Sequence, residues 1–192
     1  MEPKQNELWQ WAEAAAAYTP AEWERLPELE LYMDQVITWL NRQLEPVDGG
    51  DKPLTSSMIN NYVKGGVLPR PAGKKYTRDH LGLLMAVCML KSELPLPAIR
   101  QLFAGLGEEM TVEQQYPLFA SMQERALKAA AQKVESAKDG MPRELYILAT
   151  ELALQANAYR TAAERVLAAL EPEPAESAEK KDKKKREEPA EE

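Results

Sequence analysis

The chain has 192 residues and a formal net charge of −7, with one cysteine and one histidine. This acidic balance disfavours a protein that coats nucleic acid with its whole surface. One cysteine and one histidine cannot build a typical zinc site, so we expect no metal and no cofactor. No apolar run is long enough to span a bilayer, and the first residues lack the pattern of a signal peptide. The composition therefore predicts a cytoplasmic protein with no membrane partner.

The first thirty residues predict two helices. An alanine-rich helix is expected over 6–18, and the TPAE sequence at 19–22 is a capping box with proline at the first helical position. A short helix over 20–26 should follow. The tryptophans of this region stand at helical spacing, which is more typical of a core than of a nucleic-acid stacking surface. We take 1–30 as an N-terminal helical segment.

A short, well-delimited helix is predicted over 55–64. The hydroxyl of Thr55 can accept from the free amides of its first turn, and Gly65 and Gly66 tolerate the positive φ that ends a helix. A helix over 33–44 precedes it, and the two are separated by an insert at 45–53 rich in proline, glycine and aspartate. This order is typical of a helix-turn-helix.

The short helix has two chemically different faces. Apolar residues at helical spacing form one face, namely Met58, Ile59, Tyr62 and Val63. Amide, hydroxyl and ammonium groups form the other, on Ser56, Ser57, Asn60, Asn61 and Lys64. Asparagine can bond adenine in bidentate fashion, and lysine or serine can bond phosphate oxygens or base edges. The alternative is that this polar face is simply hydrated.

The segment after this helix predicts a β-hairpin wing. Val67-Leu68 and the residues around Tyr76 have the character of two short strands, and the turn between them carries three cations, Arg70, Lys74 and Lys75. Arg78 follows the hairpin. Residues 51–103 hold eight lysines and arginines against three carboxylates, whereas residues 1–50 hold three against ten. A basic region inside an acidic chain indicates contact with phosphate through a single module.

Two further helices over 81–103 are expected to form the scaffold of this module. They should bury the apolar residues of both, namely Leu84, Val87, Cys88, Leu90, Ile99 and Leu102. Cys88 lies in an apolar helix and is interpreted as a core residue. His80 could contact phosphate or cap the helix that follows Thr77, and the capping role is favoured.

The remainder predicts a helical hairpin and a tail. A capping signal at 111–114 starts a helix that should end near Lys138, and Pro142 starts a second helix of about 28 residues. Such a hairpin has too much apolar surface to stand alone, so it either dimerises or packs on its own chain, and it could also sense a small-molecule effector of unknown identity. Residues 171–192 hold no aliphatic residue larger than alanine and predict a disordered, charged tail.

Residues 59–68 resemble the helix and turn of MerR-type regulators, and Tyr62, Gly66, Val67 and Leu68 match that pattern. Lys74 and Tyr76 fall where that family has the arginine and tyrosine of its wing, and 94–103 is similar to its next helix. The segments 31–36, 58–64 and 74–76 together resemble an uncharacterised bacterial family of MerR-like proteins with a domain of unknown function. The resemblance covers about 31–103.

The resemblance implies a winged helix-turn-helix, double-stranded DNA as a partner, and a homodimer formed by a long C-terminal helix. The family's arginine and first tyrosine, which contact the DNA backbone, correspond to Asn60 and Asn61 here, so these amides would read bases instead. The insert at 45–53 is longer than the turn of that family. Metal-sensing members have ligands that this chain lacks.

We therefore expect a mainly α-helical protein with a MerR-like winged helix-turn-helix and a small β-hairpin wing at 31–106, a helical hairpin at 107–170 and a disordered tail. It is expected to be a dimeric, sequence-specific transcription regulator. No phosphate loop, dinucleotide fingerprint or nucleophile motif indicates an enzyme. The alternative is a non-catalytic adaptor that keeps the fold without DNA binding. The expected DNA contacts are Ser56, Ser57, Asn60, Asn61, Tyr62, Lys64, Arg70, Lys74, Lys75, Tyr76 and Arg78.

Overall fold

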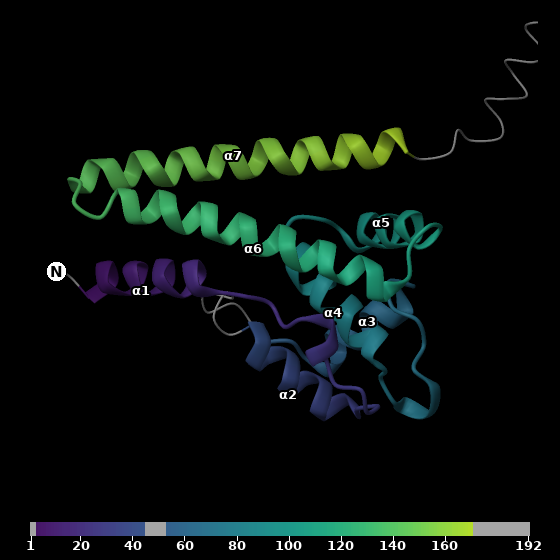
Figure 1. Cartoon of the computed structure of the whole chain (residues 1–192). Coiled ribbons are helices and arrows are strands. Elements are labelled where there is room, and N and C mark those ends of the chain that lie inside the picture. Colours follow the sequence, from purple (N-terminus) through teal and green to yellow (C-terminus); the bar gives the residue numbers. More distant parts are fainter. Residues whose placement is uncertain (1–2, 45–52, 171–192) are drawn as a thin grey trace, which may run out of the picture.

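The computed structural model of the chain describes residues 3–44 and 53–170 (Figure 1). In these ranges the protein is helical, and the expected mainly α class is confirmed. The predicted tail at 171–192 and most of the predicted insert lie outside the described residues. The helices are α1 (Pro3–Ala17), α2 (Met33–Leu44), α3 (Ser56–Lys64), α4 (Arg78–Leu90), α5 (Leu96–Gly107), α6 (Val112–Ser136) and α7 (Pro142–Ala169), with 3₁₀ turns η1 (Trp23–Arg25) and η2 (Ala72–Lys74).

The predicted β-hairpin wing is wrong, because the described residues contain no β-strand. Between α3 and α4 the chain instead forms a loop that contains η2. Pro69 and Pro71 have no backbone N–H to donate to a strand ladder, and Gly73 and Lys74 both have positive φ, of 56° and 63°. Tyr76 pairs with a residue outside the loop and forms an isolated antiparallel bridge with Leu31.

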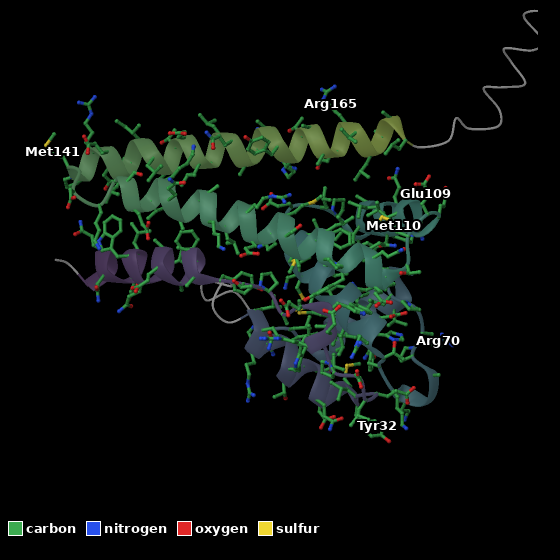
Figure 2. The ribbon with its side chains drawn as sticks, viewed as in Figure 1. Tyr32, Arg70, Glu109, Met110, Met141 and Arg165 are labelled. Atoms are coloured by element: carbon green, nitrogen blue, oxygen red, sulfur yellow. The ribbon has the colours of Figure 1, made fainter. Side chains whose placement is uncertain are left out.

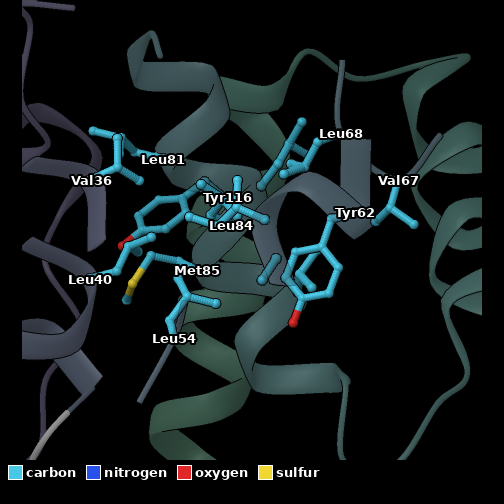
Figure 3. Packing of buried hydrophobic residues seen from close by; sticks show 14 of the residues in the cluster. Val36, Leu40, Leu54, Tyr62, Val67, Leu68, Leu81, Leu84, Met85 and Tyr116 are labelled. Atoms are coloured by element: carbon cyan, nitrogen blue, oxygen red, sulfur yellow. The ribbon is translucent and has the colours of Figure 1, made fainter. Parts of the chain in front are cut away.

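The main core lies where α2, α3, α4 and α6 meet (Figure 3). The segment from His80 to Val87 is buried without interruption, so α4 is the central helix. Of the six residues expected in this core, Leu84, Val87 and Ile99 are buried, and Cys88, Leu90 and Leu102 are partly buried against it.

One close junction joins α4, η1 and α6. The Tyr116 hydroxyl donates to the Ala21 carbonyl at 2.7 Å, and its ring lies 5.8 Å from that of Trp23. A Cβ added to Gly82 would lie 2.9 Å from the Trp23 ring. A residue without a side chain is therefore required where α4 passes beneath this tryptophan. Residues 20–26, expected to be helical, form only the short turn η1.

The helices α6 and α7 form the predicted antiparallel hairpin, and α1 lies along the half of α6 farthest from α3 (Figure 1). Thr111 and Gln114 form the expected capping box of α6, which continues through Pro117. Trp9 and Ala12 of α1 bury against Val134, with Leu145, Leu148 and Leu152 of α7 packed around them. The helix α1 therefore packs against the α6–α7 hairpin, and α2–α5 lie at the opposite end of the molecule (Figure 1).

Candidate nucleic-acid interface

The helix α3 has its polar face exposed. Thr55 caps it by accepting from the Met58 amide at 3.3 Å, as predicted, and it ends at Gly65. Ile59 and Tyr62 are buried on the inner face. The five polar residues of the opposite face are all exposed, namely Ser56, Ser57, Asn60, Asn61 and Lys64. Donors and acceptors therefore project from one side of a helix about two and a half turns long.

A side-chain clamp holds α3 against α2. Asn41 in the last turn of α2 accepts from the Leu54 amide at 2.8 Å through Oδ1, and its Nδ2 donates to the Leu54 carbonyl at 3.3 Å. Val36 and Leu40 of α2 are fully buried beneath the pair of helices. The backbone just before α3 is thus bonded to the last turn of α2. These two hydrogen bonds help to fix the position of α3 relative to α2.

The loop from α3 to α4 places two of its cations in solvent. Arg70 and Lys74 are exposed, and no carboxylate of the described residues forms an ion pair with either. Figure 2 shows Arg70 at the end of the molecule that lies away from Met141 and the tip of the hairpin. Lys64 on α3 and these two cations on the loop that follows it are all exposed, which suits contact with a polyanion.

The other two cations of this region are engaged within the chain. Lys75 Nζ lies 3.6 Å from Glu30 Oε2, and Arg78 Nη2 lies 3.0 Å from Glu28 Oε1. Arg78 also stacks over Trp23, with its guanidinium carbon 5.8 Å from the ring centroid. The geometry between Arg78 Nη2 and Glu28 does not meet the requirements of a hydrogen bond, so the pair is held by charge attraction. Lys75 and Arg78 therefore already have negative partners.

The two tyrosines of the predicted set lie in the core. Tyr62 is 4% exposed and Tyr76 is 2% exposed. Burial, with a smaller contribution from the charge of Cys88, raises the pKa of Tyr62 to about 12. Burial also raises the pKa of Tyr76. The structure thus separates these two rings from the exposed residues of α3 and gives them packing roles.

His80 has the predicted capping role. Its Nδ1 accepts from the Thr77 amide at 3.2 Å and lies 2.8 Å from the Thr77 hydroxyl. The side chain is buried, and its ring contacts that of Tyr76 edge to face. Burial lowers the pKa of His80, against the opposing effects of the Pro69 backbone and the Asp79 charge. The first turn of α4 is therefore fixed by a neutral imidazole.

Arg100 of α5 is a candidate contact that sequence reasoning missed. It is exposed, and its side chain crosses Gly66, where an added Cβ would lie 3.5 Å from Arg100 Cδ. Gly66 has φ of 70° and follows the end of α3, so the guanidinium lies near the negative pole of that helix. No local pattern links the two residues, because they come together only when α5 packs on the module.

Among the residues that the structure describes there is neither a candidate metal site nor a helix that could span a bilayer. Within residues 3–44 and 53–170, histidine, cysteine and carboxylate side chains nowhere gather in a group that could hold a metal ion. Over the same ranges, each helix is too short or too polar to cross a membrane.

A family model covers more than half of the chain, at residues 21–122, and its description reads "Domain of unknown function". The matched region begins just before η1, contains α2–α5 and ends in the first half of α6. No curated protein matches the chain, and no solved structure matches it.

Proposed function

Because the chain belongs to the DUF1836 family, whose description names no activity, we propose a function from its own residues. The protein is a transcription regulator that binds double-stranded DNA with sequence specificity. It acts in the cytoplasm, the compartment expected from the sequence.

The observation that carries this proposal is the exposed polar face of α3 with its border of cations. Five side chains able to bond base edges or phosphates point away from the core on one short helix. Arg70 and Lys74 lie on the loop after this helix, and Arg100 lies at its C-terminal end. A major groove about 12 Å wide accepts one helix, and its phosphates could then meet the cations that follow the C-terminal end of α3.

The finer assignment, a MerR-like helix-turn-helix, is supported by residues 59–68. Tyr62, Val67 and Leu68, which match the MerR pattern, are buried, and Gly66 adopts the positive φ of a helix-ending glycine. The loop between α3 and α4 takes the place of a wing in this proposal, without β structure. The arginine and tyrosine with which MerR-type regulators contact the DNA backbone are Asn60 and Asn61 in this chain, and in this proposal the two asparagines contact bases.

A homodimer is the second part of the proposal. The helix α7 contains no buried residue, although its composition is rich in apolar residues. Tyr146, Ile147 and Leu154 line one shallow hollow on it, and Tyr146 is 77% exposed. Exposed apolar side chains gathered in this way favour a protein partner. A second copy would present two α3 helices to an inverted repeat.

Selection from a random double-stranded oligonucleotide pool at physiological salt tests the proposal. We expect enrichment of an inverted repeat. Arg70→Ala/Lys74→Ala should weaken binding to every sequence and make the slope of log affinity against log salt shallower by about two. The control, Arg125→Ala/Arg165→Ala, removes two exposed cations from α6 and α7 and should leave both quantities unchanged.

Asn61→Ala tests base reading separately from phosphate binding. The variant should lose preference at one position of the enriched sequence, by about 1–3 kcal/mol, with an unchanged salt slope. Thr55→Ala weakens α3 without touching its polar face, so it separates a loss of helix from a loss of contact. An unaltered preference in Asn61→Ala would remove this residue from the reading set.

An adaptor without DNA binding is the second candidate. It is favoured by the ion pairs that occupy Lys75 and Arg78, and by the apolar hollow on α7. A folded protein that enriches no sequence and binds no duplex at low salt would support the adaptor. The partner would then be sought on α7.

A further inference from the structure

An acidic segment runs beside the basic loop. The chain from Pro27 to Leu31 lies antiparallel to residues around Tyr76, and two backbone hydrogen bonds of 2.9 Å join Leu31 and Tyr76. Two carboxylates, on Glu28 and Glu30, belong to this segment. The bridge thus holds two negative charges next to Lys75 at the end of the loop and Arg78 at the start of α4.

Each carboxylate faces one cation. Glu30 pairs with Lys75 at 3.6 Å, and Glu28 pairs with Arg78 at 3.0 Å. Both carboxylates are well exposed, at 49% and 83% of their side chains. Lys75 is 44% exposed, so its ion pair contributes little to stability and phosphate oxygens can compete for it directly. Arg78 is 22% exposed and its Nη2 atom is buried, so it is the less accessible of the two cations. The carboxylates could not move far away, because the backbone bridge keeps their segment in place.

We propose that Glu28 and Glu30 suppress binding to arbitrary duplex by occupying Lys75 and Arg78. This inference rests on the proposed function. Non-specific binding depends on phosphate neutralisation alone, so two occupied cations and two nearby carboxylates weaken it directly. Specific binding also draws on the base contacts of α3, which the carboxylates do not touch. Sequence readout is therefore kept, while the affinity for arbitrary duplex falls.

The same arrangement separates Lys74 from its neighbour Lys75. Lys74 is exposed without an ion pair among the described residues, whereas Lys75 already faces Glu30. We expect Lys74→Ala to weaken duplex binding more than Lys75→Ala. In a Glu30→Gln background the two losses should become similar, because Lys75 is then available to phosphate. This double-mutant cycle isolates the coupling between Glu30 and Lys75.

The main test compares wild type with Glu28→Gln/Glu30→Gln, using a random-sequence 30-base-pair duplex and fluorescence anisotropy over a range of salt. The variant should bind more tightly than wild type, and its slope of log affinity against log salt should be steeper by about one to two. The ratio of variant affinity to wild-type affinity should therefore rise by about tenfold or more when the salt is lowered from about 1 M to about 0.1 M. The control, Glu7→Gln/Glu13→Gln, makes the same change in net charge on α1, far from α3 (Figure 1).

The outcomes separate this inference from the proposed function. If wild type binds and the Glu28/Glu30 variant behaves like the α1 control, the inference is overturned while DNA binding stands. If both pairs of substitutions tighten binding equally, net charge is responsible, and the inference is again overturned. If neither wild type nor any variant binds duplex at about 20 mM salt, where electrostatic binding is strongest, the proposed function fails together with it.

Discussion

Single residues in this protein combine a structural role with a position beside the candidate interface. His80 is the clearest case, because its ring fixes the start of α4 next to the loop that carries Arg70 and Lys74. Its Nδ1 can accept from Thr77 only while the imidazole is neutral. The protonation of one buried side chain therefore bears on the local structure of the loop.

The stability of the protein should depend on pH through His80. Burial lowers the pKa of this residue from 6.5, so below that pH the unfolded chain binds the proton more readily. Its contribution to the free energy of unfolding is fully present above pH 6.5 and is lost as the pH falls toward the lower, folded-state pKa. Urea unfolding at pH 7.5 and pH 5.5 measures this loss.

The variant His80→Gln provides the control. A glutamine at this position can still accept from the Thr77 amide, as in an ordinary capping box, but it does not titrate. The variant should lose less stability than wild type between the two pH values. Carboxylates such as Glu124 and Glu151, whose pKa values are lowered mainly by hydrogen bonds from lysines, affect both proteins alike. Equal losses would contradict a role for His80.

At the scale of elements, the position of α3 depends on helices that are remote in sequence. The helix α4 packs beneath α2 and against α6, and η1 covers it where Gly82 comes close to Trp23. Any shift of α4 would displace the loop that precedes it, since Thr77 is the cap of this helix. The spacing at Gly82 is therefore a constraint on the interface as well as on the core.

Gly82→Ala should destabilise the protein. The new methyl group would lie 2.9 Å from a tryptophan ring that is itself held by Tyr116, and overpacking of this kind costs about 1–3 kcal/mol. Gly105→Ala is the matched substitution in α5, where nothing lies within 4 Å of the added Cβ. It should be neutral or stabilising by up to about 1 kcal/mol. Thermal or urea unfolding measures the stability of both variants. A smaller loss of stability in Gly82→Ala than in Gly105→Ala would contradict this explanation.

For the whole molecule, the elements divide between two ends. The polar face of α3 and the basic loop lie at one end, and the tip of the hairpin lies at the other (Figures 1 and 2). Exposed apolar residues follow α7 between them, including Tyr159 and Val166 in its second half. In the proposed dimer, this arrangement would leave the α3 face accessible while α7 contacts the second copy.

The proposed dimer predicts that Ile147→Glu/Leu154→Glu yields a monomer. Both residues are more than half exposed, so the substitutions should leave the fold intact while placing charge in the hollow of α7. The control, Leu29→Glu/Tyr32→Glu, makes the same change in charge on exposed apolar residues outside α7 and should leave the dimer intact. Sedimentation velocity reports the outcome, and circular dichroism checks the helix content. A wild-type protein that is monomeric throughout the micromolar range would refute the dimer.

Much of the local structure was predictable from the sequence. Helix α2 has the expected bounds, and Thr55, Thr111 and Pro142 start their helices as predicted, because caps and proline act on the adjacent backbone. The polar face of α3 followed from helical periodicity alone. The prediction of a β-hairpin wing was wrong because strand pairing requires backbone N–H donors as well as a partner strand. Pro69 and Pro71 have no backbone N–H to donate.

The sequence by itself determined most of the helices, the caps that begin α3 and α6, and the basic character of the region around α3. Only the tertiary structure decided which cations remain available, because the ion pairs of Glu28 with Arg78 and of Glu30 with Lys75 depend on the Leu31–Tyr76 bridge. It also decided that Tyr62 and Tyr76 are buried and that Arg100 lies over Gly66. Helix periodicity is a local property of the backbone, whereas these contacts join segments whose distance is set by the packing of the core.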